Sequence, residues 1–121
     1  MNINHRYAFY GSLRRGMANY VRFGHDFELI STEIIPGFRM YALEHYPYVV
    51  YTGNSADSIL VEIVEIKNPN TEFELHQFEL SVGYDYQEVE LQEGTVGIYV
   101  FKTPGNHPYV PSGDWVSYFC R

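Results

Sequence analysis

One glutamate in the sequence, Glu79, combines an ionisable side chain with apolar neighbours. It falls in a helix predicted from Glu72 to about Leu80, where a rotation of about 100° per residue puts it only about 40° from Leu75. A carboxylate half buried beside Leu75, Phe78 and nearby tyrosines has its pKa raised by desolvation, as a general acid or base near neutral pH requires. The alternative is a boundary glutamate whose head group stays in water.

A turn early in the chain is the second candidate for chemistry. It follows a short aromatic-rich strand predicted at Tyr7–Tyr10. Glycine lets backbone N–H groups approach a ligand closely, and consecutive amides in a strand-to-helix turn form an anion site that suits a carboxylate. The alternative is an ordinary strand-ending turn whose arginines, Arg14 and Arg15, are simply solvated. The candidate binding residues are Tyr10, Gly11, Ser12 and Leu13.

Other site chemistries find no support in the spacing of residues. The five histidines show no ligand pattern such as a pair four residues apart on a helix, and the single cysteine, Cys120, has no partner for zinc. Gly11-Ser12-Leu13 lacks the pattern of a nucleophile elbow, which argues against serine hydrolysis. The sequence therefore predicts neither a metal site nor a cofactor site.

Charge and hydropathy exclude two classes of partner. The formal net charge is -7 and the few Lys and Arg residues are scattered, which argues against binding nucleic acid. No apolar run approaches the roughly 20 residues that span a bilayer. Met1 leads into the polar segment Asn2–Arg6 without the apolar core of a signal peptide, and Cys120 has no partner for an internal disulfide. We therefore expect a cytoplasmic protein with no membrane partner.

Most of the chain reads as short strands. Its length of 121 residues and even composition indicate one domain spanning residues 1–121. Period-two or continuously β-branched and aromatic runs predict further strands at Phe27–Ile35, Phe38–Leu43, Tyr48–Thr52, Ser58–Ile66, Gln87–Leu91, Val96–Phe101 and Trp115–Phe119. Many strands without regular βαβ alternation indicate an α+β domain with a strongly curved, largely antiparallel sheet that could close as a barrel.

Two segments interrupt this β pattern. Gly16–Gly24 shows a loosely helical pattern and predicts a short helix. Later in the chain, Thr71 precedes Glu74 by three residues, which is the spacing of a capping box at a helix start. Glu72 and Glu74 lack the apolar neighbours of Glu79 on their helix faces, so Glu79 alone is the candidate acid or base.

The order of these motifs resembles a known family. Tyr10–Gly16, with Asn19 following, resembles the opening signature of γ-glutamylcyclotransferase-like proteins, which include the AIG2-like branch. The resemblance covers most of the chain and continues through Gly37, Tyr46-Pro47, Leu75–Glu79 against the family's Leu-Asp-x-x-Glu, Val96–Phe101 and Ser112–Trp115.

The resemblance implies a fold and an activity. The fold is a small, mixed, strongly curved β-barrel flanked by short helices. The activity is release of 5-oxoproline and a free amine or amino acid from a small-molecule γ-glutamyl substrate. It also implies that backbone amides of the Tyr10–Leu13 turn bind the γ-glutamyl part and that Glu79 acts as the acid and base, with no metal or cofactor.

Two other functions remain open at this point. One is a non-catalytic small-molecule binding module of the same fold, because His76 and Glu88 stand where the family has an aspartate and an arginine. The other is a protein interaction domain that uses a tyrosine-rich surface. The sequence specifies neither the group attached to the γ-glutamyl part nor the oligomeric state.

Overall fold

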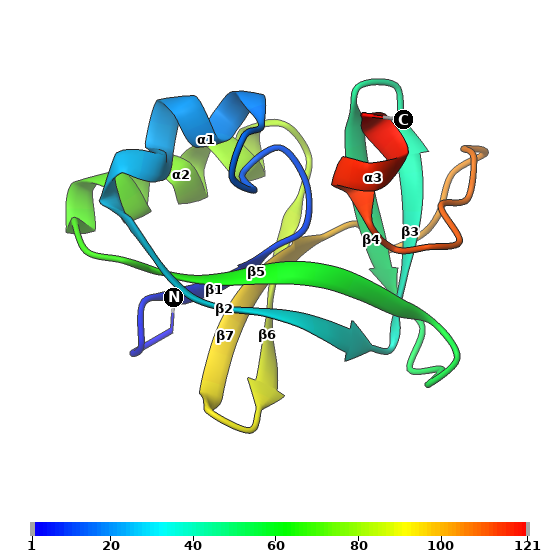
Figure 1. Cartoon of the computed structure of the whole chain (residues 1–121), viewed down its shortest axis with the longest axis horizontal. Coiled ribbons are helices and arrows are strands. Elements are labelled where there is room, and N and C mark those ends of the chain that lie inside the picture. The colour runs from blue at the N-terminus through cyan, green and yellow to red at the C-terminus, as the bar shows by residue number, and fades with distance from the viewer. Residues whose placement is uncertain (1, 121) are drawn as a thin grey trace.

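The computed structural model describes residues 2–120, and Figure 1 shows their arrangement. The elements follow one another as β1 (Arg6–Phe9), α1 (Ala18–Phe23), a 3₁₀ turn η1 (Gly24–Asp26), β2 (Phe27–Pro36), β3 (Phe38–Leu43), β4 (Tyr46–Tyr51), β5 (Ser58–Ile66), α2 (Pro69–Ser81), β6 (Asp85–Leu91), β7 (Gly94–Val100) and α3 (Trp115–Phe119). The strands predicted before α3 and the two predicted helices are present, with ends displaced by up to three residues.

The strands form a curved sheet and a separate hairpin. The five-stranded sheet has the order β2-β5-β1-β7-β6, and only the β1–β7 pair is parallel. β3 and β4 form the hairpin, which is tied to the sheet where Phe101 N donates to Val49 O at 3.0 Å. The predicted mixed α+β fold is confirmed, and within residues 2–120 the strand pairs form an open sheet plus a hairpin instead of a closed ring.

β1 lies at the centre of the sheet and is covered on both faces. Tyr7 and Phe9 belong to the apolar cluster beneath the helices, whereas Ala8 and the following Tyr10 belong to the cluster on the hairpin side. Because successive side chains of a strand point to opposite faces, both sets must be apolar or aromatic. The unbroken aromatic run is therefore explained by double burial.

α1 and α2 lie side by side over one face of the sheet (Figure 1). Phe23 of α1 and Leu75 of α2 pack into the same buried cluster, and the Phe23 and Phe78 rings are 6.0 Å apart. α2 begins at Pro69, because the Asn68 side chain caps it by accepting from Asn70 N at 2.9 Å.

The predicted capping box at Thr71 and Glu74 is wrong. These residues lie inside α2, where Thr71 is buried and donates a hydrogen bond to Asp26, and Glu74 is exposed. The capping function belongs to Asn68, two residues before Asn70 and directly before the proline that opens the helix.

The prediction that Glu72 lacks the apolar and aromatic neighbours of Glu79 is also wrong, because Glu72 lies against Tyr7. Its side chain is buried at 4% relative exposure, accepts a hydrogen bond from the Tyr7 hydroxyl and lies 2.9 Å from His5 Nδ1. The buried face of α2 is thus largely polar, since it consists of Thr71, Glu72, Leu75 and Glu79. That composition explains why hydrophobic periodicity alone gave no sign of Glu72.

Trp115–Phe119, predicted as a strand, is the helix α3. Asp114 caps it, with its side chain accepting from Ser117 N at 3.3 Å. The rings of Tyr118 and Phe119 both stack on buried Trp115, at 5.5 and 5.3 Å. Aromatic residues at positions i, i+3 and i+4 share a helix face, so the spacing of these three residues is helical. The strand was predicted because the residue types in this segment favour β structure.

None of the helices within residues 2–120 has the length and apolar character that crossing a membrane requires.

Candidate active site

A cavity of about 350 Å³ opens between α2, the turn after β1 and the β3–β4 hairpin. Its lining includes the five residues predicted from the sequence, which are Tyr10, Gly11, Ser12, Leu13 and Glu79. Segments that are about 70 residues apart in the chain therefore meet across one space. The lining also includes Asn19, Leu43, Tyr46, Pro47, Phe78, Val82, Tyr84, Tyr99 and Phe101.

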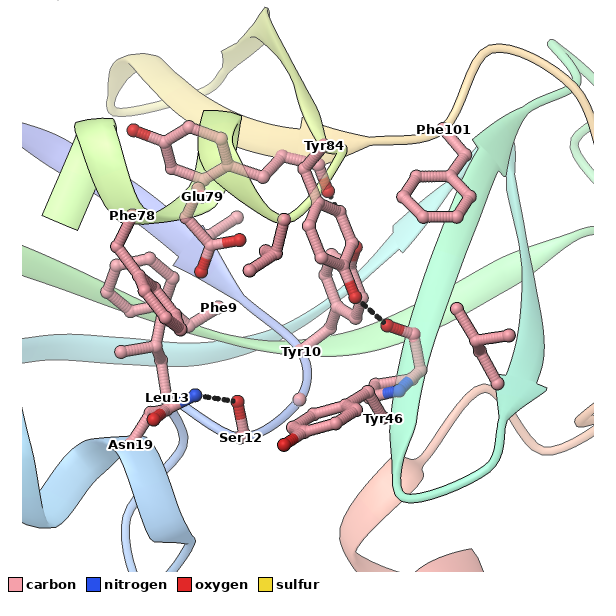
Figure 2. A pocket seen from close by; sticks show the side chains of 16 residues that line it. Phe9, Tyr10, Ser12, Leu13, Asn19, Tyr46, Phe78, Glu79, Tyr84 and Phe101 are labelled. Atoms are coloured by element: carbon pink, nitrogen blue, oxygen red, sulfur yellow. Dashed lines mark hydrogen bonds between the residues drawn. The ribbon is translucent and has the colours of Figure 1, made fainter.

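Glu79 enters this cavity from α2 and is nearly buried. Its relative exposure is 7%, and no group within residues 2–120 donates a hydrogen bond to its carboxylate. Burial raises its pKa from the ordinary 4.5 to about 7. Figure 2 shows the carboxylate pointing into the space above Ser12, between Phe78 and Tyr84. Glu79 can therefore both accept and donate a proton near neutral pH.

The comparison with Glu72 shows how unusual the surroundings of Glu79 are. Both glutamates lie on the buried face of α2, seven residues apart. Glu72 is held by Tyr7 and His5, whereas Glu79 has the cavity in front of it. Since buried charges are normally paired or hydrogen bonded, an unpartnered carboxylate at a cavity indicates a functional site.

Tyrosines surround Glu79, but their hydroxyl groups are engaged elsewhere. Tyr10 donates to the carbonyl of Tyr99 at 2.6 Å, and Tyr84 donates to the carbonyl of Pro47 at 2.6 Å. The Tyr99 hydroxyl oxygen lies 2.8 Å from His76 Nδ1. Burial, and then neighbouring charge from Glu79, raises the pKa of Tyr84 and Tyr99 above the usual range. The rings thus form a neutral wall around the carboxylate.

The turn after β1 presents unused backbone donors. The Ser12 carbonyl accepts from Asn19 N at 3.0 Å and Tyr20 N at 3.1 Å, and Asn19 Nδ2 donates to Ser12 Oγ at 2.8 Å. These contacts fix the turn against α1 through its oxygen atoms. The amides of Gly11, Ser12 and Leu13 donate to no group in residues 2–120, so they can bind an anionic or carbonyl oxygen.

Gly11 is required by the close approach of the hairpin. A Cβ atom at this position would lie 2.6 Å from Pro47 Cγ and 2.9 Å from Pro47 Cδ. The absence of a side chain lets the hairpin pack directly on the turn and form one wall of the cavity.

Arg14 is buried and anchors the turn, whereas the Arg15 side chain is exposed to solvent and only its backbone N–H donates a hydrogen bond. Arg14 is 8% exposed and donates through Nε to Glu62 at 3.1 Å and through a terminal nitrogen to Asp114 at 2.9 Å. Arg15 N donates to the other oxygen of Glu62 at 3.0 Å. Sequence reasoning missed this anchor, although an acidic residue inside the apolar strand β5 was a signal for it.

His76 and Glu88, which differ from the family pattern, both lie outside the cavity lining. Glu88 accepts from the Tyr86 hydroxyl at 3.0 Å on the exposed side of β6. Burial lowers the pKa of His76, whose Nδ1 contacts the Tyr99 hydroxyl. Neither residue places a charge in the cavity.

Comparisons with known proteins bear on this geometry. A family model described as gamma-glutamyl cyclotransferase, AIG2-like, matches residues 7–117. The chain belongs to this family. No curated protein matches this AIG2-like chain.

Solved structures resemble the AIG2-like chain over nearly its whole length. An uncharacterised protein, PH0828 from Pyrococcus horikoshii, has a TM-score of 0.79 and 25% identity, with 93% of this chain and 91% of that chain covered. The ytfP protein from Escherichia coli has a TM-score of 0.70 and 28% identity, with 93% and 97% covered. An AIG2-like protein from Mus musculus, at 18% identity and a TM-score of 0.67 with 89% and 86% covered, shares the fold.

Proposed function

We propose that the protein is a γ-glutamylcyclotransferase-type enzyme that releases 5-oxoproline and a free amine or amino acid from a small γ-glutamyl compound. Family membership supports a cyclotransferase-type function. The observation that carries the finer proposal is the unpartnered, nearly buried Glu79 carboxylate across a cavity from the free amides of Gly11, Ser12 and Leu13.

The reaction begins at the substrate's α-ammonium group. Glu79 accepts a proton from it, and the resulting amine attacks the γ-carbonyl carbon of the same molecule. A new C–N bond closes the five-membered ring, and the C–N bond to the attached group breaks. Glu79 returns its proton to the departing nitrogen, the ring nitrogen releases its second proton, and the amine leaves as an ammonium ion. Water is not consumed, because the substrate supplies its own nucleophile.

The free amides bind the substrate's oxygens in this scheme. Those of Gly11, Ser12 and Leu13 hold the α-carboxylate or stabilise the carbonyl oxygen as negative charge develops on it. Holding both reacting groups of one curled molecule replaces an encounter between two molecules, which contributes much of the acceleration.

The test is 5-oxoproline release from a panel of γ-glutamyl amines and peptides. We expect Glu79→Gln to keep the fold and substrate affinity and to lose at least about a hundredfold in kcat, the scale of a general acid and base. Glu72→Gln is the matched control, because it changes a buried carboxylate on the same helix face away from the cavity.

The control should retain most of the activity. Turnover that persists in Glu79→Gln would assign the chemistry to another group. Binding of γ-glutamyl compounds without any release, in folded wild-type protein, would instead support the non-catalytic binding module.

A further inference from the structure

The C-terminal end of α2 places Tyr84 against Glu79. The helix has Val82 as its C-cap and continues into Gly83, whose φ of +103° suits glycine. Gly83 N donates to Leu80 O at 3.2 Å and Tyr84 N donates to Glu79 O at 3.1 Å, which are the two hydrogen bonds of a Schellman motif. In this motif the side chain after the glycine commonly contacts the residue three positions before the cap. The way α2 ends therefore brings the Tyr84 ring beside the carboxylate.

At its other end Tyr84 is joined to the β3–β4 hairpin. Its hydroxyl donates to the Pro47 carbonyl at 2.6 Å, as the dashed line at Tyr84 in Figure 2 shows, and no other hydrogen bond joins residues 69–84 to the hairpin within residues 2–120. Pro47 in turn packs on Gly11, where an added Cβ would lie 2.6 Å from Pro47 Cγ. One side chain thus connects the helix end that carries Glu79 with the hairpin that supports the turn.

We propose that Tyr84 is a positioning residue, which holds the Glu79 carboxylate at a fixed separation from the amides of the Gly11–Leu13 turn and keeps water away from it. Tyr84 does not exchange a proton itself, because its hydroxyl is committed to Pro47 and burial raises its pKa above the usual range. The placement of Glu79 stands by itself, whereas the kinetic consequence rests on the proposed reaction. A displacement of an acid and base by about 1 Å is costly to turnover.

The titration of Glu79 reports its placement without any need for turnover. The midpoint depends on how far water reaches the carboxylate, so loosening Tyr84 lowers it. His76 lies outside the lining and belongs to another residue type, which a glutamate label leaves silent. The other titratable side chains in the described lining belong to a type that loses its proton near pH 10, namely Tyr10, Tyr46, Tyr84 and Tyr99.

Tyr84→Phe removes the hydroxyl and keeps the ring and the backbone amide. We expect the Glu79 carboxyl carbon, followed by NMR in protein with ¹³C-labelled glutamate and assigned by its absence from Glu79→Gln, to titrate at least about 0.5 pH unit lower than in the wild type. At pH 8, where the carboxylate is largely ionised in both proteins, kcat for 5-oxoproline release should fall at least about fivefold while KM changes less.

Tyr86→Phe is the matched control. Tyr86 lies two residues further along the chain and outside the cavity lining, where its hydroxyl donates to Glu88 at 3.0 Å. Removing that hydroxyl should leave both the Glu79 midpoint and kcat unchanged.

Gly83→Ala tests the other end of the same connection. No atom lies within 4 Å of an added Cβ at Gly83, so the substitution acts through the positive φ and displaces the Tyr84 amide from the Glu79 carbonyl. We expect the Glu79 midpoint to fall here too. Gly94→Ala, at a φ of +126° where β7 begins, controls for backbone strain outside the lining and should leave the midpoint unchanged.

The outcomes separate this inference from the reaction. A Glu79 midpoint and a kcat that stay at wild-type values in Tyr84→Phe would overturn it, as would equal changes in Tyr86→Phe. Lost stability in urea unfolding without a shift of the midpoint would give Tyr84 a purely structural role and would also overturn it. A lowered midpoint, in folded protein that releases no 5-oxoproline from any compound, would refute the reaction and support the positioning of Glu79 by Tyr84.

Discussion

At the scale of the residue, Glu79 owes its raised pKa to burial without a hydrogen-bond donor among residues 2–120. The neighbouring tyrosine hydroxyls are committed to backbone carbonyls or to His76, and none donates to the carboxylate. Its proton affinity is therefore controlled by burial alone. This arrangement has one consequence for catalysis and another for stability, and each can be measured.

Activity should depend on the ionisation of Glu79. With its pKa raised to about 7, the carboxylate form that accepts the substrate's proton predominates above that pH. We expect kcat/KM to fall about tenfold per pH unit as the pH drops below about 7. The pH–rate profile of the wild type measures this. An acidic limb near pH 4.5, the ordinary value for a glutamate, would contradict the assignment.

The stability of the folded protein should depend on pH in the opposite direction from its activity. Because the folded state raises the Glu79 pKa from 4.5 to about 7, its ionisation opposes folding fully above pH 7, and this penalty is relieved as the pH falls toward 4.5. We expect Glu79→Gln to be more stable than the wild type by up to ~3 kcal/mol at pH 8. The difference should shrink toward zero near pH 4.5, as urea unfolding of both proteins at several pH values would show.

The candidate site residues that the sequence brought forward were those that a motif identified. Glu79 and the Tyr10–Leu13 turn were found from their spacing and the family resemblance, and they line one cavity. Glu62 and Asp114 were missed, because their importance comes from a shared contact with Arg14 that only the folded chain creates.

At the scale of elements, Arg14 joins three parts of the fold. It belongs to the turn after β1, while Glu62 lies in β5 and Asp114 caps α3. Although burial opposes its ionisation, hydrogen bonds from Arg14 and Ser117 hold the pKa of Asp114 below its usual value. One buried guanidinium therefore positions the turn that lines the cavity.

Removing Arg14 should loosen the turn and destabilise the protein. Arg14→Met leaves Glu62 buried without its main cation, and we expect the free energy of unfolding to fall by about 3 kcal/mol. KM should rise more than kcat falls. Arg15→Met is the control, since Arg15 is more than half exposed and 3.7 Å from Glu62, and it should cost under ~0.5 kcal/mol. Equal losses in urea unfolding would contradict this anchoring role.

Elements were predictable where local pattern and tertiary packing agree. The central strands are apolar on both faces and were found with small errors at their ends. The short α3 was not, because five residues rich in β-forming types adopt a helix only when Trp115 is buried and Asp114 caps it. The exact start of α2 depended in the same way on the side chain of Asn68.

At the scale of the whole molecule, the cavity exists because the hairpin rests on the turn at Gly11 and Pro47. This contact joins the two-stranded and five-stranded sheets beside the site. Any group added there must push the sheets apart, and the shape of the cavity would change with the distance between the two sheets.

Gly11→Ala should therefore harm both stability and binding. Its Cβ would meet Pro47 at 2.6 Å, and we expect about 2 kcal/mol of destabilisation, typical of overpacking, together with a raised KM. The double variant Gly11→Ala/Pro47→Ala removes the clashing atoms and should recover part of both losses. Additive effects of the two substitutions, measured by thermal unfolding and kinetics, would show that the contact is not the cause.

The parallel pairing of β1 with β7 has a consequence for how the protein is made. Tyr7 lies opposite Gly97, so the strand that leads into the turn at Gly11–Leu13 gains its second neighbour only after some ninety further residues are synthesised. A nascent chain that has emerged through α2 already contains both Glu79 and the turn, yet nothing holds β1 on its β7 side. We expect the site to assemble last and in one step, at the slow rate typical of folds built on distant contacts.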